Sequence, residues 1–438
     1  MTPQLLCTSI LILALVLQAW LPRYRLLVVG TAASSAWASV VALGGVSSRA
    51  VLAEVPWDVI VILVGLGLLS LLFAETRVFS RLAVLAGRVA AQSPRRFVAA
   101  VLVTMYLVSA LVNNITALLL VLPALLVLLR LRSASQRFVR WLLGALLVAC
   151  NLGGAATPIG DFPAVLLLGR GAMGFSDYLV CAAPATAGAL LLLILFVVLG
   201  VRPERDLESD PYTVRTSVAV MEALHRNVRI DAWLLALLVA VLALMVVAWT
   251  ISPPAVGPEL VCAVGVGAAL LLRPSLGERL ARTGVDVEAV AFLVALFLLV
   301  GAVRQTGVPD AVARSLLALD VSPAMRLAIF LVIAGLLTGV FSAGPSMAAL
   351  LDVANALARE LPPATVYVGL ALSVCAGSSL LLTAATSGPL AQMLTERAGL
   401  RDAAGGPVQF DFRQFLPVGL VSFSIILLVA LGWALSRT

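Results

Sequence analysis

The stretch NLGGAATPIGDFP, Asn151–Pro163, interrupts an apolar region, 141–168, that is long enough to cross a lipid bilayer. A helix in hydrocarbon must satisfy its backbone internally, yet this stretch holds glycines, prolines and the polar residues Asn151, Thr157 and Asp161. We therefore predict that the helix breaks here. Such a break is tolerated only where protein or a water-filled cavity surrounds it, which is the usual setting of a transporter's solute and ion site. A kink that serves packing alone is the alternative.

The composition predicts an all-α integral membrane protein, because 62% of the 438 residues are hydrophobic and only 12% are charged. About twenty apolar residues make one crossing. The stretches that fit a crossing are 4–20, 26–46, 58–74, 141–168, 178–200, 232–250, 258–272, 288–303, 364–395 and 414–435. These predict about ten transmembrane helices.

Several classes of protein are excluded by single residue types. All 29 basic residues are arginine, so the lysine of a phosphate-binding Walker loop is missing and an ATP-driven pump is excluded. One histidine, His225, cannot build a metal site by itself, and the five cysteines show no CxxC spacing. We therefore expect no enzyme activity, no metal, no nucleic-acid partner and no cofactor beyond a coupling sodium ion or proton.

The distribution of arginine predicts the orientation in the membrane. With the N-terminus outside, all but seven of the 29 arginines fall on the cytoplasmic side, as the positive-inside rule favours. An even number of crossings then puts the C-terminus outside as well. We expect a multi-pass protein of the plasma (inner) membrane.

A second interrupted region, 97–130, is too long for one helix and has arginine at both ends. Its polar centre, Val112-Asn113-Asn114-Ile115-Thr116, predicts a re-entrant hairpin that turns at the asparagines, since adjacent asparagines at membrane depth need partners. Two full crossings are the alternative, but they would put four arginines outside: Arg130, Arg132, Arg137 and Arg140.

The two halves of the chain repeat each other at a nearly constant offset. LVGLGLL (63–69) matches LVALFLL (293–299), and the first hairpin matches a second one at 324–358. At a slightly smaller offset the first break matches GSSLLLTAATSGP, Gly377–Pro389. We predict a first repeat (1–200), a polar cytoplasmic linker (201–231) and a second repeat (232–438), inverted because each half crosses five times.

Three motifs resemble the ion transporter superfamily, within it the group of arsenical-pump membrane proteins and D-type sodium/proton antiporters, which is related to citrate and divalent-anion/sodium symporters. They are SALVNNITALLLVLP (Ser109–Pro123), NLGGAATPIGDFPAVLL (Asn151–Leu167) and FLLVGAVRQTGV (Phe297–Val308). The resemblance implies a static scaffold and an elevator-like transport part that carries both hairpins and both broken helices. It also implies a homodimer formed through the scaffold.

The resemblance further implies which residues line the site. Carried over by motif, the first half contributes Asn113, Asn114, Thr116, Asn151, Gly153, Gly154, Thr157 and Asp161. The second half contributes Ser342, Gly344, Ser346, Gly377, Ser378, Ser379, Thr383 and Ser387. The second tip carries Ala343-Gly344 where relatives often have an asparagine, which weakens the expectation of a sodium site.

Three functions remain open from the sequence. The first is a carrier, coupled to an ion gradient, for a small anion, a carboxylate or a metalloid oxyanion such as arsenite, because helix N-termini and neutral polar side chains suit such solutes. The second is a sodium/proton antiporter, in which Asp161, or Asp352 as a reserve, carries the ion. The third is a non-transporting protein on a transporter fold. Cys150 and Cys375 precede the two breaks and suit a soft metalloid, although packing is the commoner role of such cysteines.

Overall fold

The chain folds into helices whose order repeats halfway along the sequence. The computed structural model describes residues 3–21, 24–78, 81, 93–131, 134–202, 229–251, 253, 256–385, 387–402 and 405–438, and within these ranges it contains no β-strand. Most of the predicted linker, and His225 with it, lies outside the described residues.

The helices of the first half are α1 (Pro3–Trp20), α2 (Arg25–Gly44), α3 (Ser48–Ala53), α4 (Trp57–Glu75), α6 (Pro94–Leu111), α7 (Asn114–Leu131), α8 (Gln136–Ala156), α9 (Phe162–Gly169) and α10 (Phe175–Phe196). Those of the second half are α12 (Ala232–Ile251), α13 (Pro258–Leu271), α14 (Pro274–Thr283), α15 (Val287–Gln305), α16 (Val308–Leu317), α17 (Pro323–Phe341), α18 (Ala343–Leu357), α19 (Pro363–Ser378), α20 (Gly388–Ala398) and α21 (Phe412–Leu435). Each half thus holds a hairpin (α6–α7, α17–α18) and a broken helix (α8–α9, α19–α20).

The helix bounds follow the repeat expected from the sequence. The offset that relates 63–69 to 293–299 also relates both ends of α4 to both ends of α15. The offset between the two breaks likewise relates the start of α9 to the start of α20. The hairpins also begin alike. Ser93 and Ser322 each cap their helix by accepting a backbone N–H, and a proline follows at the first helical position.

The contacts between helices follow the same pattern in the two halves. Helix α4 packs on α13 as α15 packs on α2, while α6 packs on α8 as α17 packs on α19. In the same way α8 contacts α21, and α19 contacts α10. Every one of these contacts has a counterpart with the halves swapped, so the predicted pair of inverted repeats is confirmed.

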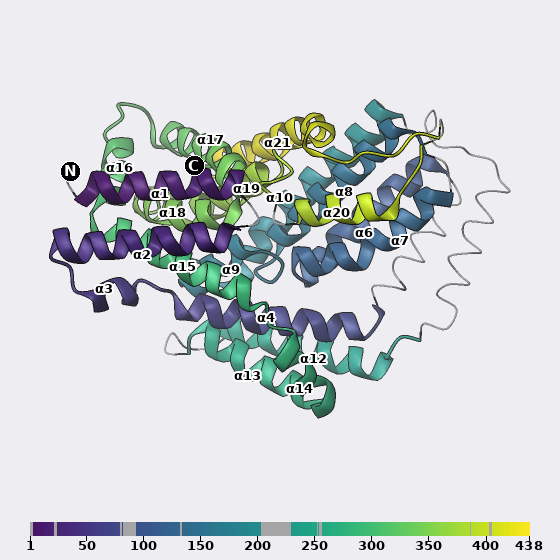
Figure 1. Cartoon of the computed structure of the whole chain (residues 1–438), viewed down its shortest axis with the longest axis horizontal. Coiled ribbons are helices and arrows are strands. Elements are labelled where there is room, and N and C mark those ends of the chain that lie inside the picture. Colours follow the sequence, from purple (N-terminus) through teal and green to yellow (C-terminus); the bar gives the residue numbers. More distant parts are fainter. Residues whose placement is uncertain are drawn as a thin grey trace.

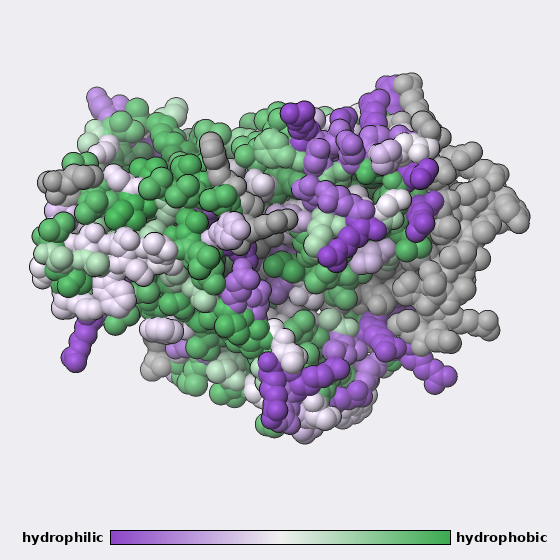
Figure 2. Space-filling model, in the orientation of Figure 1, coloured by the Kyte–Doolittle hydropathy of each residue, from purple (hydrophilic) through white to green (hydrophobic). Residues whose placement is uncertain are grey.

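Three parts of the broken helices, α8, α9 and α19, lie inside the bundle, whereas α20 is only partly buried. The most apolar window of α8 is 89% buried, whereas that of α12 is only 17% buried. Figure 1 shows α8, α10 and α19 passing through the middle, with α12, α13 and α14 along one edge. In Figure 2 apolar side chains cover most of the view, and hydrophilic ones gather over α14 and α20.

Nine helices of the described part of the chain are long and apolar enough to cross a membrane. They include the first hairpin arms, α6 and α17, whereas α1, α7, α13 and α19 have shorter apolar windows. The prediction of a multi-pass all-α membrane protein is confirmed.

One close helix contact ties α21 to the second broken helix. A Cβ atom at Gly419 of α21 would lie 2.0 Å from the backbone carbonyl oxygen of Leu380, whereas one at Gly432 of the same helix would meet nothing within 4 Å. This oxygen belongs to the backbone, so it cannot move aside as the end of a flexible side chain could. Only glycine therefore fits at position 419.

We predict that Gly419→Ala lowers the free energy of unfolding by about 1–3 kcal/mol, because the added methyl group overpacks this contact. Gly432→Ala, the matched control, should be neutral or stabilising by up to about 1 kcal/mol, since alanine favours helix more than glycine does. Thermal unfolding of the purified protein in detergent measures both. Equal stability of the two variants would contradict the close packing of α21 on the second break.

Candidate functional site

The first break separates α8 from α9 at Thr157–Asp161, where the backbone leaves the helix. Thr157 is extended, and its hydroxyl donates to the carbonyl oxygen of Ala110 at 2.6 Å. Asp161 precedes α9, and its Oδ1 accepts the backbone N–H of Phe162 at 2.9 Å. Asp161 is therefore the N-cap of α9. This placement leaves its second carboxylate oxygen for other partners.

The first hairpin turns at Val112 and Asn113, and its two asparagines have different surroundings. Asn113 is half-buried and accepts the backbone N–H of Thr116 through Oδ1 at 2.8 Å, so it caps α7. Asn114 is buried, and its Oδ1 lies 2.7 Å from the hydroxyl of Ser109. The same hydroxyl lies 2.8 Å from the carbonyl oxygen of Cys150, so its proton serves one of the two acceptors at a time.

The hairpin tip and the first break meet at Gly154. A Cβ atom at this position would lie 2.4 Å from Oδ1 of Asn114 and 3.0 Å from Cβ of Asp161. The side chains of Asn114 and Asp161 therefore lie close to each other beside Gly154. Glycine at position 154 therefore allows these two side chains to come together in front of α8.

The second hairpin tip is strained at Ser342. This residue has φ 71° and ψ 165°, a region that essentially only glycine occupies without strain, at a typical cost of about 1–3 kcal/mol. Val112 holds the equivalent position in the first tip and has an ordinary extended backbone. Two residues further on, a Cβ atom at Gly344 would lie 3.6 Å from the ring of Phe162. The second tip therefore touches the start of α9.

The two broken helices are joined by one side chain. Nδ2 of Asn151 in α8 lies 3.3 Å from the carbonyl oxygen of Ser378 and 3.1 Å from the hydroxyl of Ser379, where α19 ends. Ser387 precedes α20 and lies near the thiol of Cys150. The breaks of both halves thus lie against each other in the interior.

Two buried hydroxyl groups at the site lack a partner. Within the described ranges, Oγ of Ser346 and Oγ of Ser387 make no hydrogen bond, although both residues are buried. A buried hydroxyl without a partner is unfavourable, and the exceptions in native proteins need an explanation. Both lie at or within the first turns of helices that begin at the site, α18 and α20.

Four helices begin around this centre: α7, α9, α18 and α20. Gly154 brings the start of α7 to that of α9, and Gly344 brings the start of α18 to that of α9. The start of α20 lies near Cys150, whose thiol also contacts the carbonyl oxygen of Asn114. The N-terminus of a helix carries partial positive charge and free N–H groups. This arrangement suits an anion.

Several residues expected at the site are placed elsewhere. Gly153 packs against the backbone oxygen of Tyr106, and Gly377 packs against that of Gly335. Thr383 is exposed, although it lies in the second break. Asp352 is paired with Arg304 at one end of the molecule. None of these four residues lies beside Asn114: the two glycines pack against neighbouring backbone, Thr383 is exposed, and Asp352 forms an ion pair.

One residue that joins the site was not predicted. Ser109 bridges Asn114 and Cys150, and it lies inside the motif SALVNN. The sequence spacing between Ser109 and Asn114 does not by itself put the two side chains together. The turn of the hairpin brings them together. The motif contained Ser109, but the sequence did not show that its side chain meets that of Asn114.

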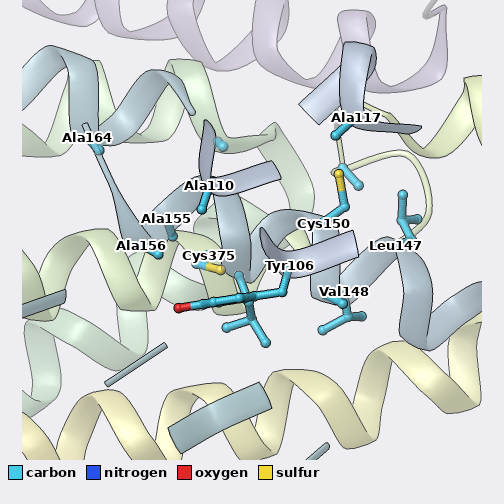
Figure 3. Packing of buried hydrophobic residues seen from close by; sticks show 14 of the residues in the cluster. Tyr106, Ala110, Ala117, Leu147, Val148, Cys150, Ala155, Ala156, Ala164 and Cys375 are labelled. Carbon is cyan, nitrogen blue, oxygen red and sulfur yellow. The ribbon is translucent and has the colours of Figure 1, made fainter. Parts of the chain in front are cut away.

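The two cysteines ahead of the breaks are buried in one cluster. Figure 3 shows Cys150 and Cys375 among Tyr106, Ala110 and the alanines of the first break. Both thiols are free. In the part of the chain that the structure describes, no group of three or more His, Cys, Asp and Glu side chains could hold a metal ion. The role of Cys150 and Cys375 in binding a metalloid stays a prediction.

Known proteins are similar to this chain over most of its length. A family model described as citrate transporter matches residues 12–377 and 263–437. An uncharacterized transporter of Mycobacterium tuberculosis is 30% identical over 359 residues, which cover 79% of this chain and 80% of that protein. The 46 kDa membrane protein of Mycobacterium leprae is 28% identical, and the match covers 85% of each chain.

One solved structure covers the whole chain. The YdaH transporter of Alcanivorax borkumensis aligns with 100% of this chain and 98% of its own, with a TM-score of 0.48 and 15% sequence identity. The match of the family model is independent of that likeness and spans both halves, including both hairpin tips and both broken helices. This chain is a membrane transporter that belongs to the citrate transporter family.

Proposed function

We propose that this transporter carries a small carboxylate or related oxyanion across the plasma membrane and is driven by an ion gradient. The observation that carries the proposal is the meeting of four helix N-termini at two facing breaks. Partial positive charge without a full cation attracts an anion and still lets it leave. The unpartnered hydroxyl groups of Ser346 and Ser387 add neutral hydrogen-bond donors to the same region.

The family description makes a carboxylate such as citrate the first solute to test. Arsenite remains in the same chemical range, because a metalloid hydroxide also accepts and donates hydrogen bonds at neutral side chains. Both solutes use the same donors at the helix starts. The proposal therefore concerns the class of small oxygen-rich solutes.

We further propose that transport occurs by an elevator movement. The transport helices would be α6–α10 and α17–α21, and the scaffold helices would be α1–α4 and α12–α15. A separate apolar cluster within α1, α2, α3 and α15 supports this division, because it stabilises part of the scaffold independently of the site. The scaffold is also where we expect a homodimer to form, and the predicted orientation puts both termini outside.

Asp161 gives a physical reason for ion coupling. Its carboxylate lies at the start of α9, where a bound anion would also lie, so the two negative charges repel each other. Binding of a proton or a sodium ion at Asp161 removes this repulsion and favours the anion. The solute and the coupling ion would then bind and move together.

The same carboxylate favours one alternative function, a sodium/proton antiporter. In that case Asp161 would exchange a proton for a sodium ion without any anion. Proteoliposomes containing a pH-sensitive dye separate the two. A pH change triggered by sodium, with no uptake of labelled citrate, sulfate or arsenite, would support the antiporter.

We predict that Ser346→Ala weakens solute binding about three- to tenfold, because one hydrogen bond to the solute is lost. The stability of the empty protein should stay unchanged or rise, since the hydroxyl has no partner among the described residues. Ser373→Ala is the matched control, because it removes an equally buried and unpartnered hydroxyl from α19 ahead of the break. Thermal stabilisation by added citrate measures the affinity. Equal citrate affinity in both variants would remove Ser346 from the site.

We predict that Asp161→Asn makes citrate affinity independent of sodium and leaves only the pH dependence that the ionisation of citrate itself causes, because the protein charge that responds to either ion is gone. The wild type should bind citrate more tightly at acidic pH or with sodium present. Asp177→Asn, which removes an exposed carboxylate at the start of α10, should behave as the wild type does. If Asp161→Asn keeps the wild-type dependence on pH and sodium, another group carries the coupling ion.

A further inference from the structure

A cavity of about 380 Å³ is lined by residues from both halves of the chain. The volume falls in the usual range of small-molecule sites, roughly 300–1,000 Å³. The wall draws on five places in the chain: the corner before α4, the loop after α9, and helices α15, α18 and α19.

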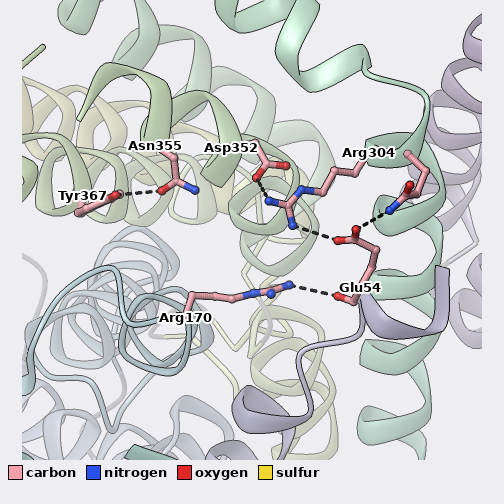
Figure 4. A network of polar contacts seen from close by, with 7 residues as sticks. Glu54, Arg170, Arg304, Asp352, Asn355 and Tyr367 are labelled. Carbon is pink, nitrogen blue, oxygen red and sulfur yellow. Dashed lines mark hydrogen bonds and ion pairs between the residues drawn. The ribbon is translucent and has the colours of Figure 1, made fainter. Parts of the chain in front are cut away.

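One arginine in this wall pairs with two carboxylates. Nη1 of Arg304 lies 3.0 Å from Oε2 of Glu54, and its Nη2 lies 2.9 Å from Oδ1 of Asp352. Gln305 donates to the other oxygen of Glu54 at 2.7 Å. Figure 4 shows that these side chains bridge α15, the corner before α4, and α18. Together Glu54, Arg304 and Asp352 carry two negative charges and one positive charge.

The second arginine is not matched in this way. Within the described residues, Arg170 makes one hydrogen bond, from Nη2 to the backbone carbonyl oxygen of Glu54 at 3.2 Å. Guanidinium has five N–H donors, which are arranged to hold a carboxylate through two bonds. Arg170 lines the cavity, so most of these donors remain for a ligand there. Across the cavity, Tyr367 donates to Oδ1 of Asn355 at 2.9 Å, which leaves the amide N–H groups of Asn355.

The inner wall of the cavity leads to the site between the breaks. Phe297 lines the cavity, and its ring packs on that of Phe162 with centroids 5.9 Å apart. Phe162 follows Asp161 directly and touches Gly344 at the second hairpin tip. Two aromatic rings thus separate the cavity from the residues that surround the helix starts.

We propose that this cavity is an access site for the solute, in which Arg170 binds a carboxylate group before the solute passes Phe297 and Phe162. A di- or tricarboxylate fits best, because one carboxylate can pair with Arg170 while another reaches the Asn355 amide. The assignment to the transport path rests on the proposed function. Binding of a carboxylate in the cavity does not rest on the proposed function. The cavity as a binding site and the cavity as part of the transport path can therefore be refuted separately.

The test places a cysteine in the cavity. Ala172 lines it and is partly exposed, and Cys181 is the one native cysteine that is not buried, so the background is Cys181→Ser with Ala172→Cys. A charged methanethiosulfonate reagent labels this thiol, and citrate is the probe ligand. At a citrate concentration ten times its dissociation constant, labelling should slow about tenfold. Arg170→Gln should lower the affinity for citrate about tenfold or more, because charge-assisted hydrogen bonds are lost.

Arg326→Gln is the matched control. Arg326 pairs with Glu360 at 2.9 Å near the start of α17, so the change removes one positive charge away from the cavity wall. This variant should keep wild-type protection by citrate. Absence of protection in the Arg170-containing protein, or equal protection in Arg170→Gln and Arg326→Gln, would overturn the proposal.

Uptake into proteoliposomes, measured on the same variants, separates the two proposals. Arg170→Gln should raise KM for citrate about tenfold with little change in kcat, since the arginine acts before the transport step. Protection without any citrate uptake in the wild type would retain the cavity as a binding site and refute the carboxylate carrier. Uptake with an unchanged KM in Arg170→Gln would remove the cavity from the transport path.

Discussion

The structure depends on one constraint, that backbone polar groups within a membrane need partners. Two helices end halfway through the bundle, and the groups at those ends would be unpaired in lipid. The chain supplies the partners from within: Thr157 bonds the first hairpin, Asp161 caps α9, and Asn151 bonds the end of α19. The surrounding helices exclude lipid from this centre. A polar centre inside an apolar protein is therefore a consequence of the breaks.

The two halves share a plan but not a chemistry. In the first half, side chains occupy the tip and the break, since Asn114 and Asp161 meet at Gly154. In the second half the tip has Gly344, and the backbone is strained at Ser342. The first half thus supplies the carboxylate that suits a coupling ion, while the backbone N–H groups that begin α9 and α18 suit an anion. This asymmetry agrees with our interpretation that solute and ion bind side by side.

Much of the fold could be predicted from the sequence, because membrane helices are defined by length, apolarity and breakers. Glycine and proline marked both breaks. The repeat of the two halves was readable because an apolar segment, a hairpin and a break recur in the same order at a nearly constant offset. The arms of the hairpins were harder to separate from full crossings, since α6 and α17 are themselves long and apolar enough to cross a membrane.

The site was only partly predictable for a physical reason. Asn114 and Asp161 are polar at membrane depth, and this alone identifies them. Gly153 and Gly377 carry the same sequence signal as Gly154, but they face backbone oxygens of neighbouring helices. Which neighbour a glycine faces is set by packing between distant segments. The cavity around Arg170 was missed for the same reason, because its wall combines distant parts of the chain, from Glu54 to Tyr367.

The most direct test of this account is a cryo-electron microscopy map of the protein in lipid nanodiscs with citrate added. The account predicts solute density between the two breaks, within hydrogen-bonding distance of the backbone N–H groups that begin α9 and α18 and beside Asn151. A map in which α8 continues unbroken to Gly169, or in which solute density lies only outside the region between the breaks, would contradict it.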